Sequence, residues 1–276
     1  MTAIKSYFEL NGQTWSGAQL ERLEYERNLH ILHQLKQHGI EIIDGDKVLD
    51  DDDIDYLSMK NAWRVSTETR SRYSGEEIAE KYKDSLAKAD EMWKRLGFAL
   101  DKPMKISVCT MNVEGMTMQE YLGVVREMQM DEKVGLSVHP EHFMAIVEEG
   151  QVIGIEPFGM YGTPTLVNVD VCPPEKLGER IMKDRREDYP TVMAGLATLT
   201  DGKTLVNCPM HQFKPTENGF EAIMAVYWPE HTPDEIVDGH CLHLAMEFYE
   251  GLRYMEKKED YDSWLKSVKQ KFYSDL

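Results

Sequence analysis

The sequence predicts an α+β protein in which an antiparallel sheet wraps round one long C-terminal helix and leaves a cavity between them. This fold class follows from the order of the local patterns. Residues 1–100 show mainly helical spacing of apolar side chains, and short β-rich runs follow Pro103. The last long segment begins with helix-start residues near Thr232. We therefore expect a helical region over residues 1–100 and a sheet-and-helix domain over residues 101–276.

Helices account for the predicted elements of the first region. One is expected from Ser16 to Gly39, with Ser16 and Gln19 forming a capping box at its start. A second should open in the acidic run 50–55, because carboxylates favour the positive end of a helix dipole. A calcium loop is the alternative there, although the spacing and glycine of an EF-hand are missing. A third is expected over residues 75–96, with Gly97 ending it.

Strands are expected in the second region, at 106–111, 143–147, 152–155, 165–171, 192–199, 205–213 and 220–227. The segments 201–203 and 217–219 are typical of hairpin turns. Helices are predicted over about 117–128 and 175–186. The last helix should start at 232–235, where Thr232 can cap and Pro233 suits the first turn, and run to about Lys257.

Composition and charge exclude several classes of function. The chain has 276 residues and a formal net charge of -18, with no basic stripe, so nucleic acid is not an expected partner. No segment approaches the roughly 18 apolar residues of a membrane span, and the first residues lack a secretory signal, so we expect a cytoplasmic protein. The four cysteines are scattered, which favours buried free thiols over disulfides.

The most informative spacing for chemistry lies in the last helix, at His243 and Glu247. Positions four apart share one helix face, so an imidazole and a carboxylate there can bind one metal ion. The pair alone is a weak signal, because a solvated His–Glu hydrogen bond has the same spacing.

Further candidate ligands precede the last helix. His139 and His142 lie in one short segment, and Glu156 and Asp170 lie on predicted strands. A divalent metal site of two imidazoles and two carboxylates would combine the helix pair with one of these histidines and one of these acids. The competing interpretation is a polar turn and a strand end. His211 should share a strand face with Phe213, where it is either a general acid or base or a core histidine.

Separated stretches resemble the phloretin hydrolase and diacetylphloroglucinol hydrolase family. The resemblance covers about residues 104–256 and depends on the segments 114–121, 139–142, 210–228 and 243–248. It implies a helix-grip fold, of the Bet v-like or START-like type. It also implies a zinc-dependent hydrolase that cleaves the carbon–carbon bond between a phenolic ring and its acyl group.

The resemblance also implies roles for particular residues. His243 and Glu247 match the helix ligands, His142 and Asp170 are the expected partners in the metal site, and His211 matches a catalytic histidine. His139 is the alternative to His142, since it fits the family's distance to the next acid, and Glu156 is the alternative to Asp170. Another divalent metal is the alternative to zinc.

One departure from the family concerns the substrate, which we expect to be a small aromatic or ketonic compound. The family carries a pair of tryptophans where this chain has Leu122, Gly123, Val124 and Val125, so the pocket should differ in size and stacking surface. This loss favours the alternative of a non-catalytic protein that binds small molecules. The sequence leaves open whether the N-terminal region is a lid or a homodimer contact.

Overall fold

A computed structural model describes residues 4–148, 150–159 and 163–273, with side chains described as far as 254 except at 128–130 and 148. A nine-stranded sheet has the order β2-β1-β5-β11-β10-β9-β8-β7-β6, and every neighbouring pair is antiparallel. The strands are β1 Lys5–Leu10, β2 Gln13–Ser16, β5 Met104–Glu114, β6 Met144–Glu148, β7 Gln151–Pro157, β8 Pro164–Val171, β9 Thr191–Thr198, β10 Leu205–Pro215 and β11 Gly219–Pro229. A separate small hairpin joins β3 Ile43–Asp44 to β4 Lys47–Val48. The fold is α+β, as the sequence predicted.

Each strand predicted after Pro103 is present in the sheet. The expected turns at 201–203 and 217–219 join β9 to β10 and β10 to β11. The sequence prediction missed the first hairpin, in which β1 and β2 meet at Asn11 and Gly12. Both residues have positive φ, 50° and 72°, and Asn-Gly is a strong signal for such a turn. Since β1 pairs with β5, the sheet extends into the first hundred residues.

The N-terminal helices are α1 Gly17–Gln37, α2 Asp51–Asp55, α3 Met59–Arg70, α4 Gly75–Lys81 and α5 Lys83–Leu96. The predicted capping box of Ser16 and Gln19 is present, and Asp50 caps α2 as the acidic run indicated. The helix expected over 75–96 is broken at Tyr82, whose buried ring stacks on His38 at 3.9 Å. The prediction also missed α3.

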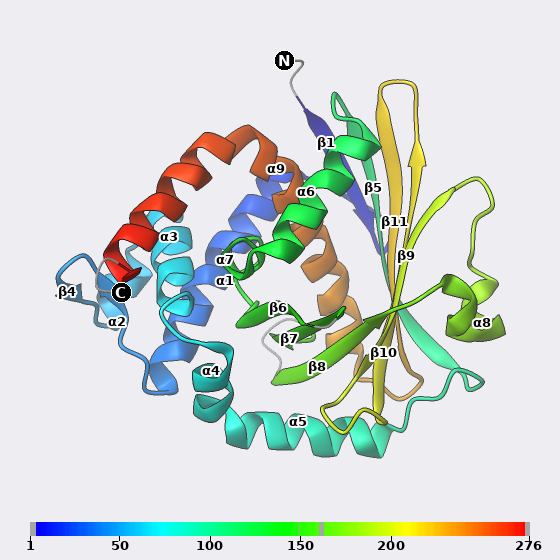
Figure 1. The fold of residues 1–276 in the computed structure, drawn as a ribbon, viewed down its shortest axis with the longest axis horizontal. Helices are drawn as coiled ribbons and strands as arrows, with labels where there is room; N and C mark the ends of the chain where they lie inside the picture. The colour runs from blue at the N-terminus through cyan, green and yellow to red at the C-terminus, as the bar shows by residue number, and fades with distance from the viewer. Residues whose placement is uncertain (1–3, 149, 160–162, 274–276) are drawn as a thin grey trace.

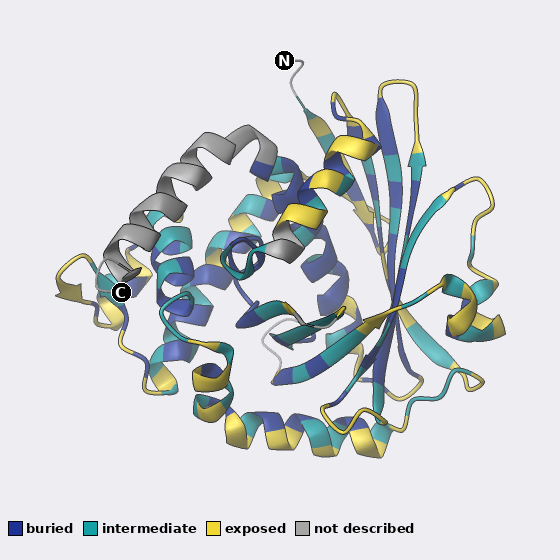
Figure 2. Cartoon of the chain, viewed as in Figure 1, coloured by how far each residue is buried: buried dark blue, intermediate teal, exposed yellow. Residues whose placement is uncertain are grey.

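The first part of the long helix α9 Asp234–Tyr273 lies against one face of the sheet, with α1 and α6 Met118–Met130 beside it (Figure 1). Strands β6 to β8 curve towards it, whereas α8 Gly178–Met182 lies on the opposite face after the short 3-10 helix Pro174–Leu177. Buried residues gather where α9 and α1 meet the sheet (Figure 2). The helix α9 is longer than predicted and α8 is shorter.

Apolar contacts join the N-terminal helices to the sheet. One buried cluster combines Leu32, Val65 and Ile78 with Phe143 and Ile155 from the region of β6 and β7. Trp93 of α5 stacks on Trp228 of β11 at 5.8 Å within the main core. Among the described residues, no helix is long and apolar enough to cross a membrane.

Candidate metal centre

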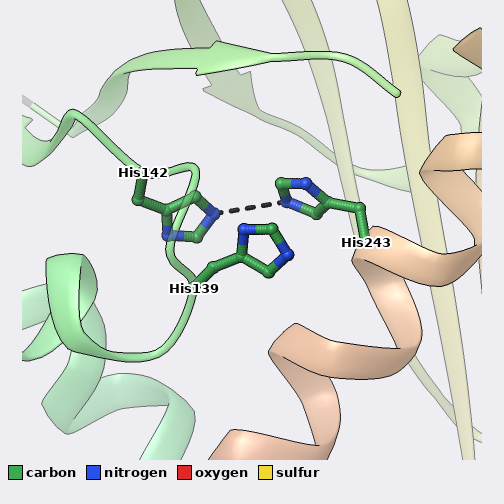
Figure 3. Close-up of side chains that lie close together, drawn as sticks. All are labelled: His139, His142 and His243. Atoms are coloured by element: carbon green, nitrogen blue, oxygen red, sulfur yellow. Dashed lines mark hydrogen bonds between the residues drawn. The ribbon is translucent and has the colours of Figure 1, made fainter. Parts of the chain in front are cut away.

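Three buried histidines meet where the segment before β6 faces α9. His139 and His142 follow α7 Glu132–Ser137, and His243 lies on α9 (Figure 3). One nitrogen of each ring lies within 4.8 Å of the others, so the three side chains could hold a metal ion.

A tighter triangle forms when Glu156 of β7 is included. The Nε2 atoms of His142 and His243 are 3.3 Å apart (Figure 3). Oε2 of Glu156 lies 3.3 Å from the first of these nitrogens and 3.2 Å from the second. Ligands about 2.0–2.1 Å from a tetrahedral ion are separated by about 3.3–3.4 Å. The donor atoms of these three residues therefore fit a divalent ion such as zinc.

His139 is placed less well for the same ion. Its ring stacks on that of His243, with the centroids 3.7 Å apart and the planes at 26°. Since the lone pair of an imidazole lies in its ring plane, two stacked rings direct their donor atoms side by side and not at one point. Its Nδ1 also accepts a hydrogen bond from the Glu141 backbone N–H at 3.1 Å. This geometry favours His142, the first choice from the sequence, over His139 as a partner of His243 and Glu156.

The expectation for Asp170 is corrected by the structure. Its side chain is exposed and accepts a hydrogen bond from the Gln151 amide, away from the histidines. Side chains alternate along a strand, and Val167 and Val169 of β8 already line the cavity at the site, so Asp170 points to the other face. Of the two predicted acids, Glu156, the alternative, is the one that reaches the histidines.

The other predicted site residues line one cavity of about 220 Å³ together with the triangle. Glu247 lies one turn after His243 on α9, and His211 of β10 enters from the sheet. As the alternation predicted, His211 points inward, whereas Met210 packs on the opposite face under α8. Small aliphatic side chains form much of the wall, among them Val125, Val138, Val152, Val167, Val169, Val226, Ala145 and Ala197.

The charges at the centre suit a cation. Burial alone would lower the pKa of His243, but the nearby carboxylates of Glu141 and Glu156 raise it to about 10. Burial alone would raise the pKa of Glu156, yet contacts with His142 and His243 hold it well below its usual value. The protonated imidazole of His243 therefore carries a positive charge between the carboxylates of Glu141 and Glu156.

His211 has a different environment. Burial lowers its pKa to about 4, so its ring is neutral near pH 7. Its Nδ1 is buried and has no hydrogen-bond partner within the described part of the protein. A neutral imidazole with a free nitrogen in an apolar cavity can accept a proton or bind a polar group of a ligand.

Sequence reasoning missed several residues around this centre. His240 stacks on His243 at 4.9 Å and also lines the cavity, and its position three residues earlier on the same helix could have indicated this. Glu141 reaches the far side of His243, where its Oε2 lies 3.6 Å from Nδ1. Arg27 and Arg70 come from the N-terminal helices, and no local pattern predicts that they approach the site.

No protein-family model matches this chain, and a search of curated proteins gives no match either. The resemblance to the phloretin hydrolase and diacetylphloroglucinol hydrolase family therefore stays a prediction.

Proposed function

We propose that this protein is a metal-dependent hydrolase, with zinc as the metal, that cleaves the carbon–carbon bond between a phenolic ring and an acyl group or acts on a related small aromatic ketone. The observation that carries the proposal is the triangle of His142, His243 and Glu156, whose donor atoms lie 3.2–3.3 Å apart at an aliphatic cavity. A helix-grip domain over residues 101–276 is part of the same proposal.

The metal ligands would be His142, His243 and Glu156, with Glu247 as a further donor from the next turn of α9. Nδ1 of His142 contacts the Gly135 carbonyl at 3.0 Å, which leaves the Nε2 lone pair available for an ion. When bound, a divalent ion would act as a Lewis acid towards a carbonyl oxygen and lower the pKa of water.

The chain's own residues would bind the substrate and move a proton. Hydrolysis adds water to the acyl carbon, breaks its bond to the ring carbon and returns one proton to that carbon, which gives a phenol and a carboxylic acid. Neutral His211 can take the proton from water at Nδ1 and return it to the ring. The valine and alanine side chains would bury the ring and exclude other water.

The segment 122–125 stands where the phloretin hydrolase family carries two tryptophans, and this difference supports a substrate whose shape differs from that of the family's substrates. Val125 lines the cavity, so this part of the wall is aliphatic and cannot stack on a ring as an indole would. We therefore propose a small acyl-phenol or related ketone as the substrate and leave phloretin itself as one member of the test series.

Metal analysis of untagged protein tests the proposal first. We expect about one zinc per chain in the wild type, and a sharp loss in His243→Ala and in Glu156→Gln. Asp170→Asn is the matched control, because this exposed carboxylate contacts Gln151 and should leave the metal in place.

Product analysis with a series of acyl-phenol ketones then tests the reaction. Equal amounts of phenol and carboxylic acid are expected from the zinc-loaded wild type. A wild type that binds no zinc even when it is supplied would contradict the hydrolase and favour a non-catalytic protein that binds small molecules in the same cavity.

A further inference from the structure

Arg70, at the end of α3, reaches the segment that carries His142. Its side chain is buried, and Nη1 donates to the carbonyl oxygens of Leu136, His139 and His142 at 2.6, 2.9 and 2.6 Å. Its Nε donates to the Ser66 carbonyl within α3 at 3.3 Å, which orients the guanidinium group. The guanidinium group of Arg70 thus binds three carbonyl groups of the segment 136–142.

These bonds bear directly on a metal ligand. The backbone of His142 is held through its carbonyl by Arg70, and its ring is held through Nδ1 by Gly135. Both ends of the residue are fixed, so Nε2 has little freedom to leave the triangle with His243 and Glu156. Groups behind a metal ligand set its orientation and basicity in this way.

A second N-terminal arginine acts on the same segment. Arg27 of α1 forms a buried ion pair with Glu141, the neighbour of His142. The other oxygen of Glu141 lies 3.6 Å from Nδ1 of His243, which is within ion-pair range. The helices of the first hundred residues therefore meet the site through charged side chains as well as through apolar packing.

We propose that Arg70 is a positioning residue of the metal centre, so that the N-terminal helices form part of the active site and are not only a lid or a dimer contact. This inference rests on the proposed metal-dependent function. Loss of the Arg70 side chain would free the segment 136–142 to move and weaken metal binding, while His142, His243 and Glu156 all remain in the chain.

Arg70→Met and Arg70→Lys test the proposal, with Arg64→Met as control. Arg64 lies on the same helix but pairs with Asp44 and Glu68 at a partly exposed position. We expect zinc to bind about 10–100-fold more weakly to Arg70→Met, as for other partners of metal ligands. Arg70→Lys keeps a charge and should recover part of the loss, and Arg64→Met should match the wild type.

The readouts separate positioning from general stability. Zinc affinity is measured by competition with a chelator, and the absorption spectrum of the cobalt-substituted protein reports the coordination geometry. The cobalt spectrum of the Arg70 variants should change, whereas a purely structural role would only lower the unfolding temperature. If Arg70→Met does not fold, Arg70→Lys provides the same comparison.

The outcomes also distinguish this inference from the proposed function. Wild-type zinc affinity and an unchanged cobalt spectrum in a folded Arg70 variant would overturn the positioning role and leave the metal centre intact. Absence of metal binding in the wild type would overturn the proposed function itself.

Discussion

At the scale of single residues, the notable feature is an imidazole between one buried carboxylate, Glu141, and one half-buried carboxylate, Glu156. His243 has Glu156 near Nε2 at 3.2 Å and Glu141 near Nδ1 at 3.6 Å. The carboxylates raise the pKa of His243 to about 10 although burial opposes this. His243 is a proposed metal ligand, and a metal ligand must be deprotonated, so ion binding at this site would require the loss of this proton.

Zinc binding near pH 7 should therefore release about one proton per chain from His243. The native metal-free form holds the proton below its pKa of about 10, so zinc affinity should rise by about tenfold per pH unit between pH 7 and 9. Calorimetry in buffers of different ionisation enthalpy measures the release. An affinity that does not change over this range would contradict the prediction.

His211→Gln should separate catalysis from metal binding. Since His211 is the proposed proton carrier, the substitution should lower kcat by about 10²–10⁴-fold. Zinc content should stay at the wild-type level, because His211 is not one of the proposed ligands. In the wild type, the base form of His211 should persist down to a pH near its pKa of about 4. An equal loss of zinc in the variant would place His211 in the metal centre instead.

At the scale of elements, the end of β7 meets the beginning of α9. Gly159 has a φ of +89°, and a Cβ atom there would lie 2.6 Å from Cα of Ile236 and 2.9 Å from the carbonyl oxygen of Glu235. The close approach of these backbones fixes the start of α9 relative to the strand that carries Glu156. Glycine is required both for its conformation and for its lack of a side chain.

Gly159→Ala should lower the free energy of unfolding by about 2–4 kcal/mol, from backbone strain and overpacking together. Gly202→Ala is the matched control, since Gly202 also has positive φ but nothing within 4 Å of the added atom. The control substitution Gly202→Ala should lower the free energy of unfolding by about 1 kcal/mol, because only the left-handed backbone conformation opposes it. Urea denaturation compares the two variants. Equal losses would show that the contact with α9 has no energetic effect.

The positions of most helices and strands could be predicted from the sequence, whereas the breaks and turns between them were harder to predict. Alternating β-rich runs and capping residues located the strands after Pro103 and the start of α1. Periodicity alone did not reveal the break at Tyr82, because apolar spacing continues from α4 into α5. The ring of Tyr82 packs on His38 of a distant segment, a contact that local spacing does not predict. The Asn11-Gly12 turn was available as a signal, and the short strands beside it were not recognised.

At the scale of the whole molecule, residues far apart in sequence share cores and the site. One core joins α1 and α3 to Phe143 and Ile155, and the main core joins Trp93 to the sheet and α9. Local spacing predicted that His243 and Glu247 share one face of α9, and both line the cavity. The choice of Glu156 over Asp170 did not, because it depends on which face of β7 and β8 turns towards α9.

Unfolding in urea should therefore occur as one cooperative transition, although residues 1–100 and 101–276 differ in secondary structure. Tryptophan fluorescence and far-ultraviolet circular dichroism should give coincident curves, since Trp93 and Trp228 lie in the shared core. Two separated transitions would show that the helical region unfolds independently of the sheet.

The ring of Trp228 lies edge-on to His240 at 5.0 Å, and His240 in turn stacks on His243. Because its indole lies so close to the proposed metal centre, Trp228 can serve as an intrinsic fluorescent probe of metal binding there. Binding of a paramagnetic ion such as cobalt or copper should quench the emission of Trp228, so that a titration can be followed by light, without a dye or a label.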